Sequence, residues 1–439
     1  MTIKLRHLAL QLLPSLCLLL FPALAFAQNK QDYCEPSPVI KAELKKVADV
    51  YEEELPFAAR LERQKTMLQE LMAKYPDDFH LQRRYQDSRR AGFFADKDAL
   101  VVDYRAQMEK NPTDPTAVYL YARMLVGRQT KEALALAEKL TQQAPDFPWT
   151  QLQLAEIYNY PNFKDAAKSR EHLKQWMAKC PNERASFNLV SRLGDKEMMA
   201  AAVQRLRTIL ASSSDNDDLP YWDNLWTLQF KSTPVPEHAQ LRKQIAEDVK
   251  NLRAKNLNTK EYLQALQAGY KQVGDKTGQR WAEDEILRLF PKSQVTRWMI
   301  QSRYDDDHPY PKPDESEDKK QAYQQQMIQT TSEWIKRWPT DERSWSTRIY
   351  SLSAFKSSAN ADMEAAYNGY AKAHAAEGAF FSTPPLEVTV AQFYLERGFH
   401  LQEIPELIQK GLTDIEKIEK SRGVSDLYPR SDEIDSNLS

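Results

Sequence analysis

Four prolines recur at nearly equal intervals in the first half of this 439-residue chain. They belong to the phrases Lys74-Tyr75-Pro76-Asp77, Lys110-Asn111-Pro112-Thr113, Gln143-Ala144-Pro145-Asp146 and Lys179-Cys180-Pro181-Asn182. Successive prolines are 36, 33 and 36 residues apart, and each separates two amphipathic stretches. Proline cannot continue a helix, and the Asp, Asn or Thr after it favours the start of the next one. A period of this length indicates a solenoid of stacked helical hairpins.

The side chains between these prolines follow a pattern of small and large residues. After Pro112 the apolar positions are Tyr121, Ala122 and Leu125, then Ala133, Ala137 and Leu140; in the next unit they are Leu154, Ala155 and Tyr158, then Ser169, Leu173 and Trp176. A small residue, Ala122 or Ala155, stands where two helices of a pair would cross closely. This pattern resembles the tetratricopeptide consensus, most clearly over residues 112–181. The flanking units are degenerate, with Gln86 and Ser191 at the close-approach position.

Composition agrees with a helical chain. The 439 residues include 11 glycines, which is about 2.5% against a usual ~7%. Propellers, Rossmann domains and P-loop domains need glycine at turns and phosphate loops, so they are disfavoured. Lys+Arg 60 against Asp+Glu 62 gives a formal net charge of −2, so no polybasic surface for nucleic acid is expected. The predicted fold class is all-α, a helical-hairpin solenoid of degenerate tetratricopeptide-like repeats.

Residues 1–27 have the features of a signal peptide. Lys4 and Arg6 precede an apolar stretch, and Ala25-Phe26-Ala27 supplies a small-x-small cleavage site, which makes Gln28 the expected mature N-terminus. An uncleaved membrane anchor is the alternative, but two prolines and the cleavage site argue against it. No later window reaches the ~18 apolar residues of a spanning helix, so no membrane span is expected after cleavage. The sequence therefore predicts an exported protein, periplasmic or secreted.

Polar stretches divide the rest of the chain. Ser212–Asp218 is a polar break and the best predicted domain boundary, and residues 304–320, rich in Asp, Glu and Pro, are expected to form a solvated loop. The predicted regions are tetratricopeptide-like repeats over 28–211, a middle helical region over 219–303, a C-terminal helical region over 318–420 and a polar tail over 421–439.

A search for catalytic motifs gives negative results. The sequence has no C-x-x-C, H-E-x-x-H, G-x-S-x-G, Walker or G-x-G-x-x-G motif. Ser353–Lys356, Ser214–Asn216 and Lys276–Gly278 together resemble the penicillin-binding and β-lactamase motif set. They occur in the wrong order, and the last lies between helical stretches instead of on a strand. Asp305–His308 are consecutive, whereas metal ligands come from spaced positions, so neither a metal nor a cofactor site is predicted.

Two cysteines remain after signal cleavage. Cys34 and Cys180 would close a loop of 146 residues if they were bridged, and an oxidising compartment permits such a bridge. Spacing alone leaves open whether they form a disulfide or two unpaired thiols. Neither belongs to a C-x-x-C pair, so the isolated chain is expected to have no thiol–disulfide oxidoreductase activity.

A second resemblance covers roughly residues 30–430. It is carried by Leu289-Phe290-Pro291, by Ile335–Pro339 followed by Trp345, and by Thr383-Pro384-Pro385 through Val388–Tyr394 to Ile404–Leu407 and Gly411-Leu412. These phrases resemble the N-terminal helical region of exported bacterial thioredoxin-like disulfide reductases. In that family a redox domain with a C-x-x-C pair follows the helical region. This sequence has no such pair, so the resemblance implies at most the non-catalytic or truncated arm of such a reductase.

The favoured function is a scaffold that binds a protein or peptide and has no catalytic activity of its own. The alternatives are the reductase arm and, more weakly, a helical glycan-active enzyme, which needs acidic residues converging in a groove. In tetratricopeptide solenoids the first helix of each pair lines the concave face. On the helices expected here, the residues not needed for packing are Arg123, Gln151 and Glu156. They are the candidate ligand contacts.

Overall fold

The computed structural model describes residues 32–53, 55–91, 97–182, 186–193, 195–212, 218–377 and 385–422. The predicted signal peptide, the centre of the polar break and most of the polar tail lie outside these ranges. Within them all regular structure is helical and there is no strand, which confirms the predicted all-α fold class. None of the helices in these ranges combines the length and the apolar character of a membrane span.

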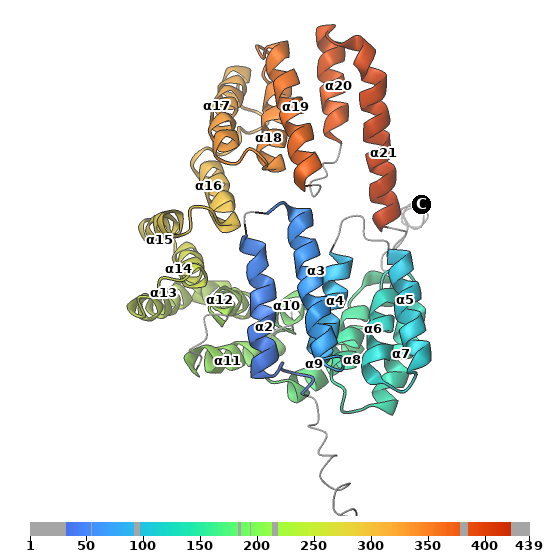
Figure 1. The fold of residues 1–439 in the computed structure, drawn as a ribbon. Helices are drawn as coiled ribbons and strands as arrows, with labels where there is room; N and C mark the ends of the chain where they lie inside the picture. Colours follow the sequence, from blue (N-terminus) through green and yellow to red (C-terminus); the bar gives the residue numbers. More distant parts are fainter. Residues whose placement is uncertain are drawn as a thin grey trace, which may run out of the picture.

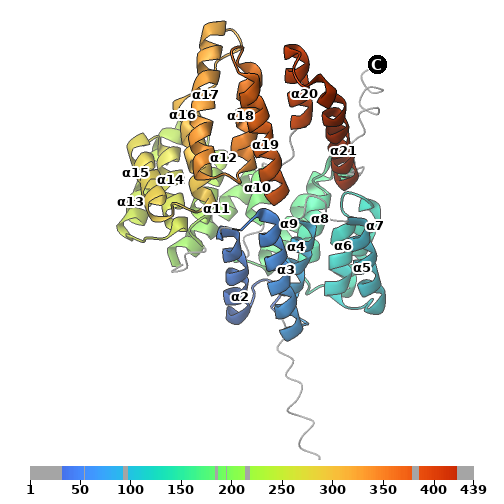
Figure 2. The ribbon, with the colours of Figure 1, turned by 45° about the horizontal axis from the view of Figure 1, so that its top comes forward.

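The helices pack against each other in chain order, and the chain follows a curved path (Figures 1 and 2). The first half contains α2 (Pro38–Asp49), α3 (Phe57–Lys74), α4 (Phe79–Arg90), α5 (Lys97–Lys110), α6 (Pro115–Leu125), α7 (Thr130–Gln143), α8 (Trp149–Ile157), α9 (Ala166–Lys179), α10 (Ser186–Leu193) and α11 (Lys196–Ser212). The second half contains α12 (Tyr221–Ser232), α13 (His238–Ala254), α14 (Lys260–Val273), α15 (Lys276–Leu289), α16 (Gln294–Asp307), α17 (Glu317–Arg337), α18 (Glu342–Ala354), α19 (Asn360–Glu377), α20 (Leu386–Arg397) and α21 (Ile404–Arg422).

The recurring prolines mark helix ends, as predicted. Tyr75, Ala144 and Cys180 are the C-cap residues of α3, α7 and α9, and each precedes a proline. Their ψ angles lie between 67° and 70°, outside the helical region, because a following proline disfavours the α conformation. The next helix often starts on an acidic cap: Asp78 accepts a hydrogen bond from the amide of Leu81, and Asp114 caps α6 in the same way.

The small residues lie at the predicted close approaches. Ala122, Ala133 and Ala155 are at most 1% exposed. The Ser169 hydroxyl of α9 donates a hydrogen bond to the Ala155 carbonyl of α8 at 2.7 Å, so these two helices touch at the predicted positions. In the degenerate unit, Gln86 is fully buried and its amide donates to the Leu120 carbonyl of α6 at 2.8 Å. In this unit, a polar side chain at the close-approach position therefore bonds to the first helix of the next hairpin.

The hydrophobic core extends without interruption from α4 to α16. One cluster runs from Phe79 to Met299 and includes residues on both sides of the predicted break at Ser212–Asp218. A separate cluster joins α18, α19, α20 and α21, centred on Ile349, Val390 and Tyr394. The C-terminal helices therefore form a second packing unit.

The start of the chain returns to contact helices far along the sequence. Glu52, just after α2, pairs with Lys260 at the start of α14, with 2.5 Å between carboxylate and ammonium. Helix α3 also contacts α19, which lies above it in Figure 1. These contacts close the curve of helices on itself.

One predicted loop is shorter than expected. Residues 304–307 continue α16, which ends at Asp307, so only the remainder up to Ser316 connects to α17. Asp307 pairs with Arg280 of α15, and this pairing helps to explain why the acidic residues extend the helix.

Lys276–Gly278 forms the first turn of α15, capped by Asp275, and is not on a strand.

Candidate functional site

Polar side chains from four successive first helices converge on one surface, which we call the inner face. It comprises Arg83 and Arg90 of α4, Arg123 of α6, Gln153 and Glu156 of α8, and Arg192 of α10. The Glu156 carboxylate interacts electrostatically with all four arginines. The electrostatic interactions of Glu156 therefore link α4, α6, α8 and α10.

Arg123 and Glu156, two of the three predicted contacts, lie on this face. The Arg123 guanidinium donates to the Gln86 side-chain oxygen at 2.8 Å and to the Asp87 carboxylate at 2.5 Å, so it is anchored to α4. Glu156 keeps solvent-exposed surface, although many protein atoms surround it. Burial raises the pKa of Glu156, and the arginines, Arg123 foremost, oppose that rise.

The expectation that Gln151 points outward is wrong. Gln151 is 3% exposed, and its side-chain oxygen lies 2.8 Å from Nδ1 of His172 on α9. One turn of an α-helix takes 3.6 residues, so Gln153 and Glu156 lie on the same side of α8, whereas Gln151 is turned toward His172. Gln153 is about as buried as Gln151, but it lies on the side of α8 that also carries Glu156.

Gln153 has unsatisfied hydrogen-bonding groups. It is 4% exposed, and within the described part of the chain neither its side-chain nitrogen nor its side-chain oxygen has a hydrogen-bond partner. Buried amides are nearly always paired, so an unpaired one calls for an explanation. The sequence analysis missed Gln153 because its position depends on how α8 is rotated about its own axis relative to α9. The periodic pattern alone did not determine this rotation.

The Arg83 guanidinium lies over an aromatic ring. Its guanidinium carbon is 3.7 Å from the centre of the Trp149 ring, which joins α4 directly to α8. Its buried Nε forms no hydrogen bond within the described residues. Trp149 also packs edge-on against Trp176 and near Phe79, so the ring is held in the core.

The two cysteines are joined. Cys34 and Cys180 form a disulfide with 5.2 Å between their Cα atoms. The segment around Cys34 is held by further contacts, since Trp149 donates from its indole nitrogen to the Tyr33 carbonyl and Tyr33 packs edge-on against Phe147. The bridge ties this segment to the end of α9. A buried, bonded cysteine such as Cys180 has no thiolate to act as a nucleophile.

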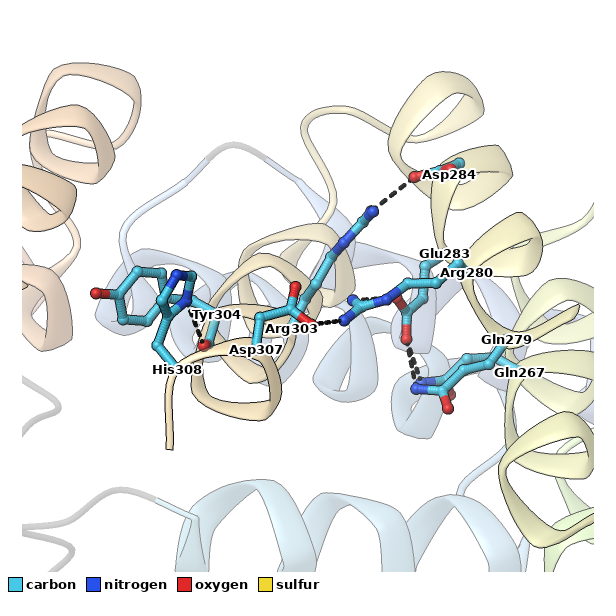
Figure 3. A network of polar contacts seen from close by, with 9 residues as sticks. All are labelled: Gln267, Gln279, Arg280, Glu283, Asp284, Arg303, Tyr304, Asp307 and His308. Carbon is cyan, nitrogen blue, oxygen red and sulfur yellow. Dashed lines mark hydrogen bonds and ion pairs between the residues drawn. The ribbon is translucent and has the colours of Figure 1, made fainter. Parts of the chain in front are cut away.

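A polar network connects α14, α15 and α16 (Figure 3). The buried Glu283 carboxylate accepts hydrogen bonds from Arg280 at 3.0 Å, Gln279 at 2.8 Å and Gln267 at 3.3 Å. Arg280 also forms an ion pair with Asp307, and Arg303 forms one with Asp284, at 2.6 Å between guanidinium and carboxylate. Every carboxylate in this network is engaged with a neighbouring helix, so the network serves helix packing. No group of three or more potential metal ligands is found among the described residues.

Two cavities lie where the first helices meet the later ones. The smaller, about 260 Å³, lies between α3, α16 and α18 and is lined by Phe57, Arg297 and the exposed Trp298. The larger, about 660 Å³, lies between α2, α3, α4 and α14 and is lined by Arg84 and Lys260. Both cavities lie in the region where the start of the chain contacts helices far along the sequence, as it does in the Glu52–Lys260 pair.

Comparisons with known proteins give only distant similarities. No protein-family model matches the chain, and no curated protein matches it. Among solved structures, Naa15/Naa10 bound to HypK is similar with a TM-score of 0.27 and 11% identity over 85% of this chain. The tetratricopeptide-repeat domain of P58(IPK) is similar with a TM-score of 0.20 and 16% identity, covering 77% of this chain and 91% of that domain. The chain spans 63% of the length of the first of these structures.

Proposed function

We propose that this chain is a protein-interaction scaffold that binds a polypeptide segment across the inner face. The observation that carries the proposal is the unpaired amide of Gln153. Leaving such a buried group without partners costs about 1–3 kcal/mol. A peptide backbone offers a carbonyl and an N–H side by side, so it satisfies both ends of this amide at once.

The surroundings of Gln153 suit a segment of several residues. The inner face collects side chains from α4, α6, α8 and α10, which follow one another along the solenoid. A ligand laid across these helices would meet Arg90, Arg123 and Gln153 at successive positions. Stacked helical hairpins commonly present such an extended inner surface for binding.

We propose that the chain binds its partner and does not itself catalyse a reaction. The buried carboxylate of Glu283 is occupied by three donors, and the cysteines are joined to each other. These groups stabilise the fold. The thioredoxin-like resemblance remains a sequence-level hypothesis, and under it the scaffold would be the binding arm of a redox protein.

We also propose that the protein works outside the cytoplasm. The signal-like segment 1–27 and the disulfide between Cys34 and Cys180 support this location, because disulfides persist in oxidising compartments. Sequencing of the chain recovered from an exported fraction should begin at Gln28. A chain recovered only with its first 27 residues would contradict the proposal.

A peptide-display selection tests the binding function. Peptides selected by the full chain and resynthesised with a fluorescent label should bind it, and Gln153→Met should weaken their binding about tenfold or more. Methionine keeps the volume of the side chain and removes both polar ends, so stability should hold or rise. Gln175→Met on α9 is the matched control, because Gln175 bonds only within its own helix, to Glu171. Equal affinities of wild type and Gln153→Met would refute the role of this face.

A further inference from the structure

We infer that the segment bound by the inner face is acidic. This inference rests on the proposed function and adds the chemical class of the partner. It is carried by the balance of charge on the inner face, where four guanidinium groups meet two carboxylates.

Arg90 is the clearest unmet charge. It forms no hydrogen bond and no ion pair with the described residues, and it is only partly exposed. Burial lowers the pKa of Arg90, and the like charge of Arg123 lowers it further. A buried guanidinium is normally paired, so an anion brought to Arg90 would relieve an unfavourable charge.

The other arginines extend this charge across the face. Arg83 rests on Trp149, and its Nε has no hydrogen-bond partner in the described part of the chain. Arg192 of α10 is exposed and interacts electrostatically with Glu156. An acidic segment that crossed from α4 to α10 would meet one arginine after another.

The two carboxylates of the site do not neutralise it. Asp87 is already bonded to Arg123 at 2.5 Å. Glu156 interacts with all of the arginines, and Asp87 also interacts with Arg90, so two carboxylates face four guanidinium groups. The inner face is therefore net positive, although the whole chain carries a formal charge of −2.

The side-chain amide of Gln153 favours a polypeptide over other polyanions as the ligand. An amide with both donor and acceptor unpaired matches a peptide backbone, which has both groups, whereas phosphate oxygens only accept. Guanidinium groups pair with carboxylates in two-pronged geometry, which suits Asp and Glu side chains. The combination points to a peptide with acidic side chains and not to a polyphosphate.

The test uses fluorescein-labelled oligoglutamate, with oligoglutamine of equal length as the uncharged probe. Wild-type chain should bind oligoglutamate at least tenfold more tightly than oligoglutamine, and added salt should weaken that preference. Arg90→Gln should reduce oligoglutamate affinity about tenfold and leave oligoglutamine binding unchanged. Because Arg90 has no hydrogen bond or ion pair to lose among the described residues, the variant should fold normally, which circular dichroism checks.

Arg84→Gln is the matched control. It removes the same charge from the same helix, but Arg84 lines the cavity toward α2 and α14 instead of the inner face. It should leave oligoglutamate binding within about twofold of wild type. An equal loss in Arg84→Gln and Arg90→Gln would mean that overall charge governs binding, and this would overturn the inference.

The outcomes separate the inference from the proposed function. Selected neutral peptides that bind as tightly as oligoglutamate, with Gln153→Met still weakening them, would overturn the acidic preference and keep the scaffold. Absence of oligoglutamate binding would also overturn the inference. Polyphosphate that competes fully while Gln153→Met has no effect would refute a polypeptide partner.

Discussion

The hairpins α8–α9 and α18–α19 both bring their two helices into close contact, but they do so with different side chains. In α8–α9, Ala155 and Ser169 allow the helices to touch, and large apolar residues such as Trp176 fill the space between them. In α18–α19 the close approach is at Gly369, where an added Cβ would lie 2.3 Å from the Trp345 ring. Both hairpins need a small residue at the crossing, but only the first shows the spacing by which the repeat was detected.

The two hairpins also differ in what they bury. Helix α18 buries polar residues along its length: Glu342, Ser344, Ser346 and Ser351. Glu342 is paired with His374 of α19, at 3.0 Å between carboxylate and ring nitrogen. On the inner face, Gln153 and Arg90 have no hydrogen-bond partner among the residues that the structure describes. Polar residues that find partners inside the chain support the fold, and those that do not are candidates for ligand contacts.

The largest expected difference between the two regions concerns the disulfide. Cys34→Ala with Cys180→Ala should cost about 2–5 kcal/mol, because the bridge closes a loop of 146 residues. The loss should be confined to the N-terminal repeats, which the bridge joins. Hydrogen exchange should accelerate in α4–α9 and stay unchanged in α18–α21. Uniform acceleration in both regions would show that the two units unfold together.

A smaller effect is expected at the close approach of α8 and α9. Ala155→Leu should overpack the contact with Ser169 and cost about 1–3 kcal/mol. The urea midpoint measures the change. Ala167→Leu on α9 adds the same side chain at an exposed position and should be nearly neutral. A neutral Ala155→Leu would mean that the helix register in this repeat is wrong.

The smallest expected effect is the pH dependence of stability that two histidines contribute in opposite directions. The hydrogen bond to Glu342 raises the pKa of His374, so its stabilising contribution is complete below the ordinary value of 6.5 and is lost as pH rises through the raised pKa. Burial lowers the pKa of His172, so protonation opposes folding below 6.5 and stability increases as pH rises through this range. Each contribution should be on the order of 1 kcal/mol or less.

Nuclear magnetic resonance titration of the ring protons measures both histidines in one experiment. His374 should titrate at higher pH than His172. Glu342→Gln should bring the pKa of His374 down and leave that of His172 where it was. Coincident titration curves in the wild-type chain would contradict the contrast between the two hairpins.

The sequence by itself determined the helical hairpins and where many of them begin and end. Proline after Tyr75 or Ala144 excludes the helical conformation at that residue, and this effect is local, so it can be predicted without the fold. The positions of Ala122 and Ala155 followed from the repeat for the same reason. The acidic residues at 305–307 were misjudged as loop because the pairing of Asp307 with Arg280 is not local.

Only the tertiary structure decided which polar residues share a surface. The choice between Gln151 and Gln153 depends on how α8 turns against α9, and one residue of rotation moves a side chain by 100°. The contact of Arg83 with Trp149, the pairing of Glu52 with Lys260 and the disulfide of Cys34 with Cys180 join residues 66, 208 and 146 positions apart. Such contacts depend on small rotations that accumulate from one hairpin to the next, and no local pattern in the sequence records them.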